Sequence, residues 1–245
     1  MTNVSTTQLK RVPASRSTVA KKYAMAVSGL IMVGYLVLHM YGNLKALQSP
    51  EAFNDYAHHL RTIGEPILPH TGLLWIVRVV LLAAVLIHAY CAISLWRRNK
   101  KAAGFTGGLG AKRYHSKQNR TGIQRSYASF TMRWGGVTIA LFIVFHILNL
   151  TTNDIHPGGA SDEPYEKLHN SFQYFWVLLS YTVAMIAVGF HLWHGFWSAL
   201  QTLGQNRSST RIESNANTAA IVIAAVITIG FLVPPFSIYF FGLGG

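Results

Sequence analysis

Five long apolar segments, separated by polar loops, constrain this chain more than any other feature of its sequence. Each segment approaches or exceeds the roughly 20 residues that an α-helix needs to cross a bilayer. The chain is therefore predicted to be an all-α integral membrane bundle of five transmembrane helices, spanning residues 22–245 behind a polar tail at 1–21. The segments cover about residues 22–44, 71–96, 132–152, 173–200 and 217–241.

The composition supports lipid as the main solvent of the chain. Hydrophobic residues make up 51% of the 245 residues and charged residues only 12%, which is roughly half the usual charged share. A soluble protein of this length needs a polar surface that this composition does not supply. The last segment contains Pro234 and Pro235, which are predicted to kink it or to end it early.

The charged residues predict how the chain is oriented. Of the 21 Lys and Arg residues, 17 lie in the N-terminal stretch Lys10–Lys22 and in the stretches 97–133 and 201–215, whereas seven of the eight acidic residues lie in the loops 45–70 and 153–172. Basic loops remain on the cytoplasmic side, so the N-terminus is predicted to be cytoplasmic and the protein to be a multi-pass protein of the cell inner (cytoplasmic) membrane. A net charge of +13 is also found in proteins that bind nucleic acid. Here, however, the basic residues lie in loops between apolar segments, which argues against nucleic acid as a partner.

The single cysteine, the N-terminal tail and the 45–70 loop each carry a further structural expectation. The single cysteine, Cys91, excludes a disulfide within the chain and an iron–sulfur cluster held by its own thiolates. The tail lacks the short apolar stretch of a cleaved secretory signal. The 45–70 loop can include a short surface helix around Glu51–Arg61.

Histidine is the residue type that points to a function. Four of the 11 histidines fall one in each of the first four apolar segments: His39, His88, His146 and His191. An ionisable side chain inside lipid is costly and is a candidate for a functional site. A single such histidine is equally well explained as a hydrogen-bonded core residue, but four in successive helices are harder to explain in that way.

Counting along the predicted helices places these histidines at two depths. At 1.5 Å per residue, His39 and His146 lie roughly 20–25 Å above the cytoplasmic boundary, and His88 and His191 lie close to it. His39 is therefore predicted to pair with His146 at an outer level, and His88 with His191 at an inner level. Two imidazoles from facing helices at one depth are the axial ligands that a b-type haem requires.

Small residues one turn from these histidines would leave room for a porphyrin, although small residues also allow ordinary close packing of helices. Zinc or di-iron sites would need carboxylates or thiolates beside the histidines, and the segments contain no acidic residue. We therefore predict two b haems. The residues one turn away are Ala84 and Ala92 for His88 and Ala187 and Gly195 for His191, and on the first helix Gly29 and Gly34 lie below His39.

Three further residues concern the same sites. His194 lies three residues after His191 and is the alternative fourth ligand. Arg78, inside the second segment, could face the propionates of the outer haem or extend its charge to the interface. Arg133 is a candidate for the propionates of the inner haem.

Four short stretches around these histidines resemble a known family. The chain is similar, over roughly residues 20–205, to the single large membrane anchor of succinate dehydrogenases, a di-haem cytochrome b subunit also found in related fumarate reductases. The stretches are Ser28-Gly29 with Leu38–Asn43, Ile87–Tyr90, Met132–Gly136 leading to His146, and Phe190–Trp197.

The resemblance implies that the four histidines are the axial haem ligands. It also implies a flavoprotein subunit that oxidises succinate and an iron–sulfur subunit docked on the cytoplasmic face. Electrons would pass from the iron–sulfur protein through the inner and outer haems to quinone, either menaquinone or ubiquinone, and the complex could form a higher oligomer. The chain itself has no dinucleotide fingerprint for flavin.

A quinone site would need polar groups that can donate to the quinone carbonyls. Two functional alternatives also remain open: the cytochrome b subunit of a hydrogenase or formate dehydrogenase, and a haem-free anchor or transporter. The candidate quinone residues are Glu65, His70 and Arg78 at the outer level, and Tyr23, Ser28 and His115 at the inner level.

Overall fold

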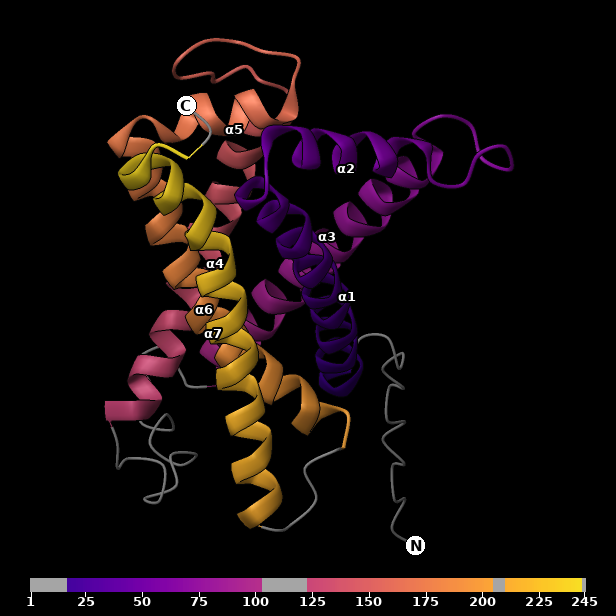
Figure 1. The fold of residues 1–245 in the computed structure, drawn as a ribbon. Helices are drawn as coiled ribbons and strands as arrows, with labels where there is room; N and C mark the ends of the chain where they lie inside the picture. The colour runs from indigo at the N-terminus through magenta and orange to yellow at the C-terminus, as the bar shows by residue number, and fades with distance from the viewer. Residues whose placement is uncertain (1–16, 103–122, 205–209, 244–245) are drawn as a thin grey trace, which may run out of the picture.

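A computed structural model describes residues 17–102, 123–204 and 210–243 of the chain. These residues form helices, and none of them lies in a β-strand. Long helices form an elongated bundle, and two shorter helices, α2 and α5, lie across one end of it (Figure 1). The helices are α1 (Thr18–Leu44), α2 (Pro50–Thr62), α3 (Gly72–Ala102), α4 (Ile123–His146), α5 (Pro164–Phe172), α6 (Phe175–Thr202) and α7 (Thr210–Phe241), with the short helices η2 (Lys45–Leu47) and η5 (Ile147–Thr151).

Within the described residues, five helices are long and apolar enough to cross a membrane, which confirms the predicted all-α fold with five spans. They are α1, α3, α4, α6 and α7. The helices extend beyond the predicted spans, to Ala102 in α3 and Thr202 in α6, and back to Thr18 in α1, Ile123 in α4 and Thr210 in α7. A helix satisfies its own backbone hydrogen bonds, so it can continue into water where the apolar sequence stops. The chain is accordingly a multi-pass membrane protein.

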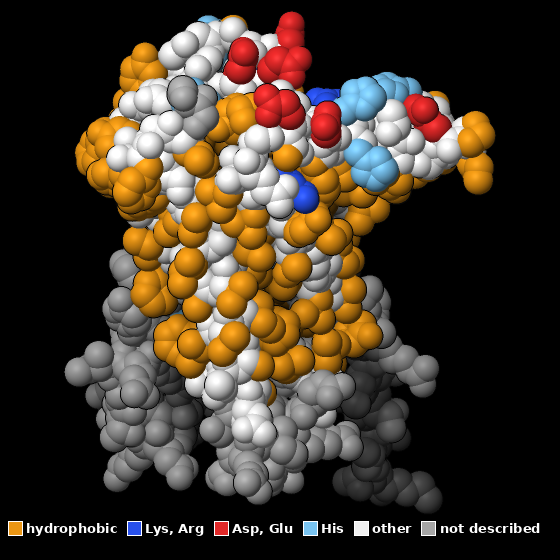
Figure 2. All heavy atoms as spheres, in the orientation of Figure 1, with side chains coloured by type: hydrophobic (Ala, Val, Ile, Leu, Met, Phe, Trp, Pro, Cys, Tyr) orange, Lys and Arg blue, Asp and Glu red, His pale blue; other side chains and the backbone are white. Residues whose placement is uncertain are grey.

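Helix α6 is the centre of the bundle. It contacts α1, α4 and α7, whereas α3 packs mainly on α1. The buried residues of α6 and α7 form one core cluster, which includes Val188 and Ile227, and a second cluster under α5 includes Phe172. The outer surface of the bundle remains apolar over its middle (Figure 2), as lipid contact requires.

The predicted surface helix around Glu51–Arg61 is present as α2. Ser49 caps it by accepting a hydrogen bond from the backbone N–H of Ala52 at 3.1 Å, and Pro50 occupies the first turn. The backbone N–H of Glu51 and the Ser49 hydroxyl lower the pKa of the Glu51 carboxyl by hydrogen bonding to it.

Two expectations about the second half of the chain are corrected. The segment 153–172, predicted as a loop, ends in α5, which begins at Pro164 and buries Tyr165, Leu168 and Phe172 on one face. Helix α7 does not end early but continues through Pro234 and Pro235 to Phe241. Proline is tolerated in transmembrane helices because neighbouring groups satisfy the freed backbone atoms.

Candidate functional site

The first pair of histidines joins α1 to α4. The ring centroids of His39 and His146 lie 5.8 Å apart, with the ring planes at 81°. The His39 ring also stacks on Tyr35 with centroids 5.2 Å apart, and Phe231 of α7 lies 5.6 Å away. Aromatic rings on α1 and α7 thus pack against the first pair.

The second pair joins α3 to α6. The ring centroids of His88 and His191 lie 6.0 Å apart, with the planes at 59°. His194 does not take part in this contact: its Nδ1 donates to the carbonyl oxygen of Phe190 at 3.1 Å, and its ring packs on Trp193. The structure therefore brings His191, rather than His194, to His88.

The two pairs lie at different heights along the bundle. A Cβ atom on Gly29 would lie 3.4 Å from Cε1 of His88, so the second pair is level with Gly29, ten residues before His39 on α1. Tyr181 touches His146 and lies ten residues before His191 on α6. Ten residues of helix correspond to about 15 Å, and both helices give this same separation between the pairs.

The hydrogen bonds of His146 fix which of its nitrogens is free. The Nδ1 atom of His146 lies 3.2 Å from the Tyr181 hydroxyl oxygen. That hydroxyl donates its own hydrogen to Oδ1 of Asn149 at 3.0 Å, so its oxygen accepts from Nδ1–H of His146. The lone pair of Nε2 is then available for a ligand.

Asn149 is completely buried and holds this arrangement in place. It lies in the π-helical turn η5 directly after His146, a distortion that often occurs at functional sites. Its Nδ2 atom donates to the carbonyl oxygen of Ile155 and to Oγ of Ser171, both at 2.9 Å. The network therefore ties His146 to α6, to α5 and to the segment between them.

His88, like His146, uses its Nδ1 atom to donate a hydrogen bond. Its Nδ1 lies 3.1 Å from the carbonyl oxygen of Met25, which can only accept, so Nδ1 carries the hydrogen. The buried Ser28 hydroxyl lies 3.4 Å from the same nitrogen. Nε2 of His88 is therefore free for a ligand, as in His146.

His191 leaves a buried nitrogen to be satisfied. Its Nδ1 atom is buried and has no hydrogen-bond partner among the described residues. A buried polar atom without a partner is costly in a protein. A histidine in this situation needs a further group at the site, and a bound metal that polarises the ring or takes its lone pair is one such group.

The donor set of each pair suits a haem iron. A metal–nitrogen bond to histidine is about 2 Å and the nitrogen lies about 1 Å from the ring centre, so two imidazoles on opposite sides of one metal have centroids about 6 Å apart. The described residues contain no cluster of three or more histidine, cysteine or acidic side chains. Each pair supplies two nitrogens, and a porphyrin would supply the other four ligands to iron.

Glycines leave space beside the second pair. A Cβ atom on Gly136 of α4 would lie 3.8 Å from Cε1 of His191, and a Cβ on Gly195, about one turn after His191, would meet no neighbouring atom within 4 Å. Side chains therefore do not fill these positions, as a flat prosthetic group would require. Gly34 is exposed, so the open space around it is not enclosed within the bundle.

The two candidate propionate partners lie at the ends of this region. Arg78 is exposed on α3, ten residues before His88, with its guanidinium 5.0 Å from the centroid of Trp75. It thus lies at the height of the first pair. Arg133 is exposed on α4, one turn before Gly136 and hence near the second pair.

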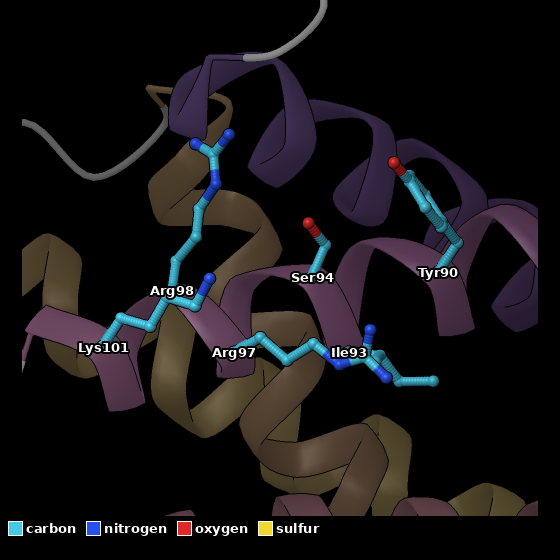
Figure 3. Close-up of a pocket in the computed structure, with 6 residues that line it drawn as sticks. All are labelled: Tyr90, Ile93, Ser94, Arg97, Arg98 and Lys101. Atoms are coloured by element: carbon cyan, nitrogen blue, oxygen red, sulfur yellow. The ribbon is translucent and has the colours of Figure 1, made fainter. Parts of the chain in front are cut away.

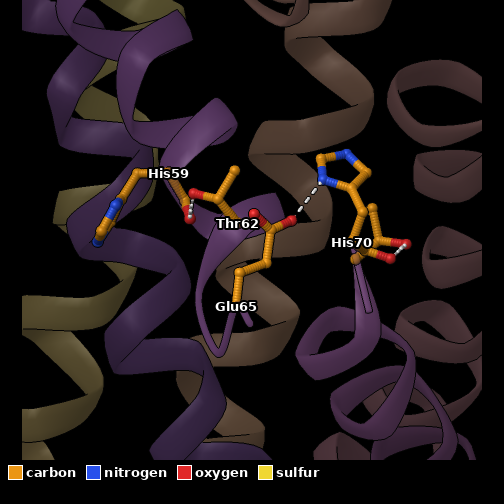
Figure 4. A network of polar contacts seen from close by, with 5 residues as sticks. His59, Thr62, Glu65 and His70 are labelled. Carbon is orange, nitrogen blue, oxygen red and sulfur yellow. Dashed lines mark hydrogen bonds and ion pairs between the residues drawn. The ribbon is translucent and has the colours of Figure 1, made fainter. Parts of the chain in front are cut away.

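The candidate quinone residues are spread over the molecule rather than gathered in one cleft. Glu65 and His70 form an exposed ion pair of 3.0 Å in the loop after α2, beside the Thr62 hydroxyl that donates to His59 (Figure 4). Ser28 lies against His88, and Tyr23 is exposed elsewhere on α1. His115 lies outside the described residues.

Sequence reasoning did not identify Tyr181, Asn149 or the carbonyl of Met25. A signal for Asn149 was present, because it is a polar side chain within an apolar segment and follows His146 by three residues. Its burial depends on α5, which was predicted as loop.

Together these features define a class of protein: a helical multi-pass membrane protein with two pairs of facing histidines stacked along the bundle. Residues 115–233 match the family model of the succinate dehydrogenase/fumarate reductase transmembrane subunit. The match covers just under half of the chain and includes His146 and His191. It supports a place in this family. No curated protein and no solved structure matches the chain significantly.

Proposed function

We propose that this chain is the membrane-anchor cytochrome b subunit of a succinate dehydrogenase or a related fumarate reductase. In this proposal one b haem is held between His39 and His146 and a second between His88 and His191. The observation that carries the proposal is the spacing of the two pairs, whose centroids lie 5.8 and 6.0 Å apart at two heights.

The residues of the chain act by holding and orienting the ligands. Tyr181 and the Met25 carbonyl each accept the Nδ1 hydrogen of a histidine, which leaves the Nε2 lone pair free for a ligand and makes that ligand more basic. Arg78 and Arg133 offer positive charge to propionates at the two heights. When bound, haem b supplies reversible one-electron chemistry, so two haems would carry electrons across the bilayer toward quinone.

The family match supports the identity of the partners. Transmembrane subunits of this family belong to succinate dehydrogenase or fumarate reductase, so the proposed partners are a flavoprotein subunit and an iron–sulfur subunit on the cytoplasmic face. The same match favours these complexes over a hydrogenase or formate dehydrogenase. The electron acceptor would be menaquinone or ubiquinone. The inner candidate Ser28 and the outer pair of Glu65 and His70 are the proposed polar groups for it.

The proposal is tested by purifying the complex through a tag on this chain in mild detergent. We expect a flavin-containing and an iron–sulfur subunit to co-purify with succinate-oxidising activity, and a reduced-minus-oxidised spectrum typical of b haem. Hydrogenase or formate dehydrogenase subunits in the preparation would replace this proposal by the alternative. A preparation without any b-type spectrum would establish a haem-free anchor.

A further inference from the structure

A second candidate site lies at the end of the bundle opposite α2 and α5. A cavity of about 300 Å³ follows the last turns of α3 beside the beginning of α1 (Figure 3). Its lining changes from apolar to cationic along the helix. The lining residues are Tyr90, Ile93, Ser94, Arg97, Arg98 and Lys101.

The change from an apolar to a cationic lining follows the change from hydrocarbon to charged headgroups at the surface of a bilayer. Tyr90 and Lys101 are separated by 11 residues of helix, or about 16 Å. Tyr90 and Ile93 belong to the apolar part of α3 and are 65% and 48% exposed, whereas Arg97 and Lys101 lie where the span ends. A ligand in the cavity would therefore meet an aromatic and aliphatic wall at one end and cations at the other.

The cavity lies outside the haem region. At about 100° per residue, Arg97 lies on the face of α3 opposite His88, and Tyr90 lies within about 20° of that opposite face. His88 faces α1 and α6. Arg97 and Lys101 are exposed and are therefore not directed at the second histidine pair, whereas Arg98 is only partly exposed and reaches toward α1.

Helix α1 completes the cavity on one side. The Lys21 ammonium donates to Oγ of Ser94 and lies 5.4 Å from the ring centroid of Tyr90. Arg98 donates to Oγ1 of Thr18 at 3.1 Å. These contacts between helices place a fourth cation at the rim and hold the wall in position.

Among the acidic side chains that the structure describes, none lies at this end of the bundle. Every acidic residue whose side chain the structure describes lies in α2, in α5 or in the loops beside them, and Figure 2 shows acidic side chains gathered at that end. A cationic cavity at a bilayer boundary, remote from every described carboxylate, favours an anionic ligand.

We propose that this cavity binds the phosphodiester headgroup of an anionic phospholipid. Arg97, Arg98 and Lys101 contact the phosphate, Ser94 donates or accepts a hydrogen bond at the glycerol, and Tyr90 and Ile93 pack against the first acyl carbons. The site does not depend on haem and goes beyond the proposed electron transfer.

The test measures lipid binding to the delipidated 245-residue chain by native mass spectrometry. We expect phosphatidylglycerol to bind at least tenfold more tightly than phosphatidylcholine, with a preference that falls as salt is raised. In Arg97→Gln/Lys101→Gln the phosphatidylglycerol affinity should fall roughly thirtyfold because two cations are lost. The matched control is Lys45→Gln/Arg61→Gln, which removes the same charge at the other end and should retain the preference.

Three results would overturn the proposal. Equal binding of the two lipids to the unaltered chain, which needs no variant to fold, would show that the headgroup charge is not recognised. Equal losses in both double variants would show that total charge alone acts. Inorganic phosphate that binds as tightly as phosphatidylglycerol, with the same loss in Arg97→Gln/Lys101→Gln, would identify a free-phosphate site instead of a lipid site.

Discussion

The Tyr181 hydroxyl oxygen lies 3.2 Å from Nδ1 of His146, and the hydroxyl donates a hydrogen bond to Oδ1 of Asn149. The tyrosine oxygen is therefore the acceptor that fixes the tautomer of this histidine. An acceptor at Nδ1 makes the opposite nitrogen a stronger ligand and favours the ferric state of a bound haem iron. This relationship yields the first prediction.

Replacement Tyr181→Phe removes the acceptor and retains the ring. We expect both haems to remain bound and the midpoint potential of one of them to rise, because the ligand becomes less basic. A potentiometric titration of the visible spectrum measures this shift. Tyr174→Phe, on the exposed start of α6, is the control and should leave both potentials unchanged. Unaltered potentials in Tyr181→Phe would refute a role for the hydroxyl in tuning the haem.

His191 and His194 offer a matched pair of variants on one helix. His191 faces His88, whereas His194 bonds to its own helix. His191→Ala should therefore lose one of two haems, and His194→Ala should retain both, as measured by pyridine haemochrome content per chain. The reverse outcome would make His194 the ligand.

Among the described glycines, Gly29 comes nearest to a ring of the second pair. A Cβ atom there would lie 3.4 Å from the His88 ring, so a larger side chain must displace the imidazole. Gly29→Leu should reduce haem content to about one per chain, with the loss confined to the second pair. Val27→Leu adds a methylene on an exposed position of the same helix and should have no effect on haem content. Two haems in Gly29→Leu would show that His88 can move without loss of ligation.

Asn149 should matter for stability as well as for the histidine. It is fully buried and satisfies Tyr181, Ser171 and the carbonyl of Ile155. Asn149→Ala leaves these groups without partners, at a cost of about 2–4 kcal/mol. The apparent thermal unfolding midpoint of the detergent-solubilised chain should fall by several degrees, whereas Asn170→Ala, on the neighbouring α5, should change it little. An unchanged midpoint in Asn149→Ala would mean that water replaces these bonds.

The positions of the spans could be predicted from sequence because a helix that crosses lipid needs about 20 consecutive, mainly apolar residues. Such stretches are easily recognised in the sequence. The pairing of His39 with His146 and of His88 with His191 could also be predicted, since the rise per residue in a helix converts sequence position into depth. The structure brings these rings together. Ligation of haem by them remains a prediction.

Other features depended on tertiary contacts that periodicity does not encode. Helix α5 is only nine residues long, and its apolar face is buried only because α2, α6 and α7 pack against it. The π-helical turn that directs Asn149 toward Tyr181 depends on three separate segments of the chain. The continuation of α7 through Pro234 depends on its neighbours, whereas intrinsic propensity favours a break.

The central claim is that each pair of histidines holds one b haem, and haem quantification per chain tests it most directly. Pyridine haemochrome absorbance, divided by the concentration of the purified chain from amino-acid analysis, should give two haems. It should give one in His39→Ala/His146→Ala and one in His88→Ala/His191→Ala. A value of zero or one for the unaltered chain, or two in either double variant, would contradict the account.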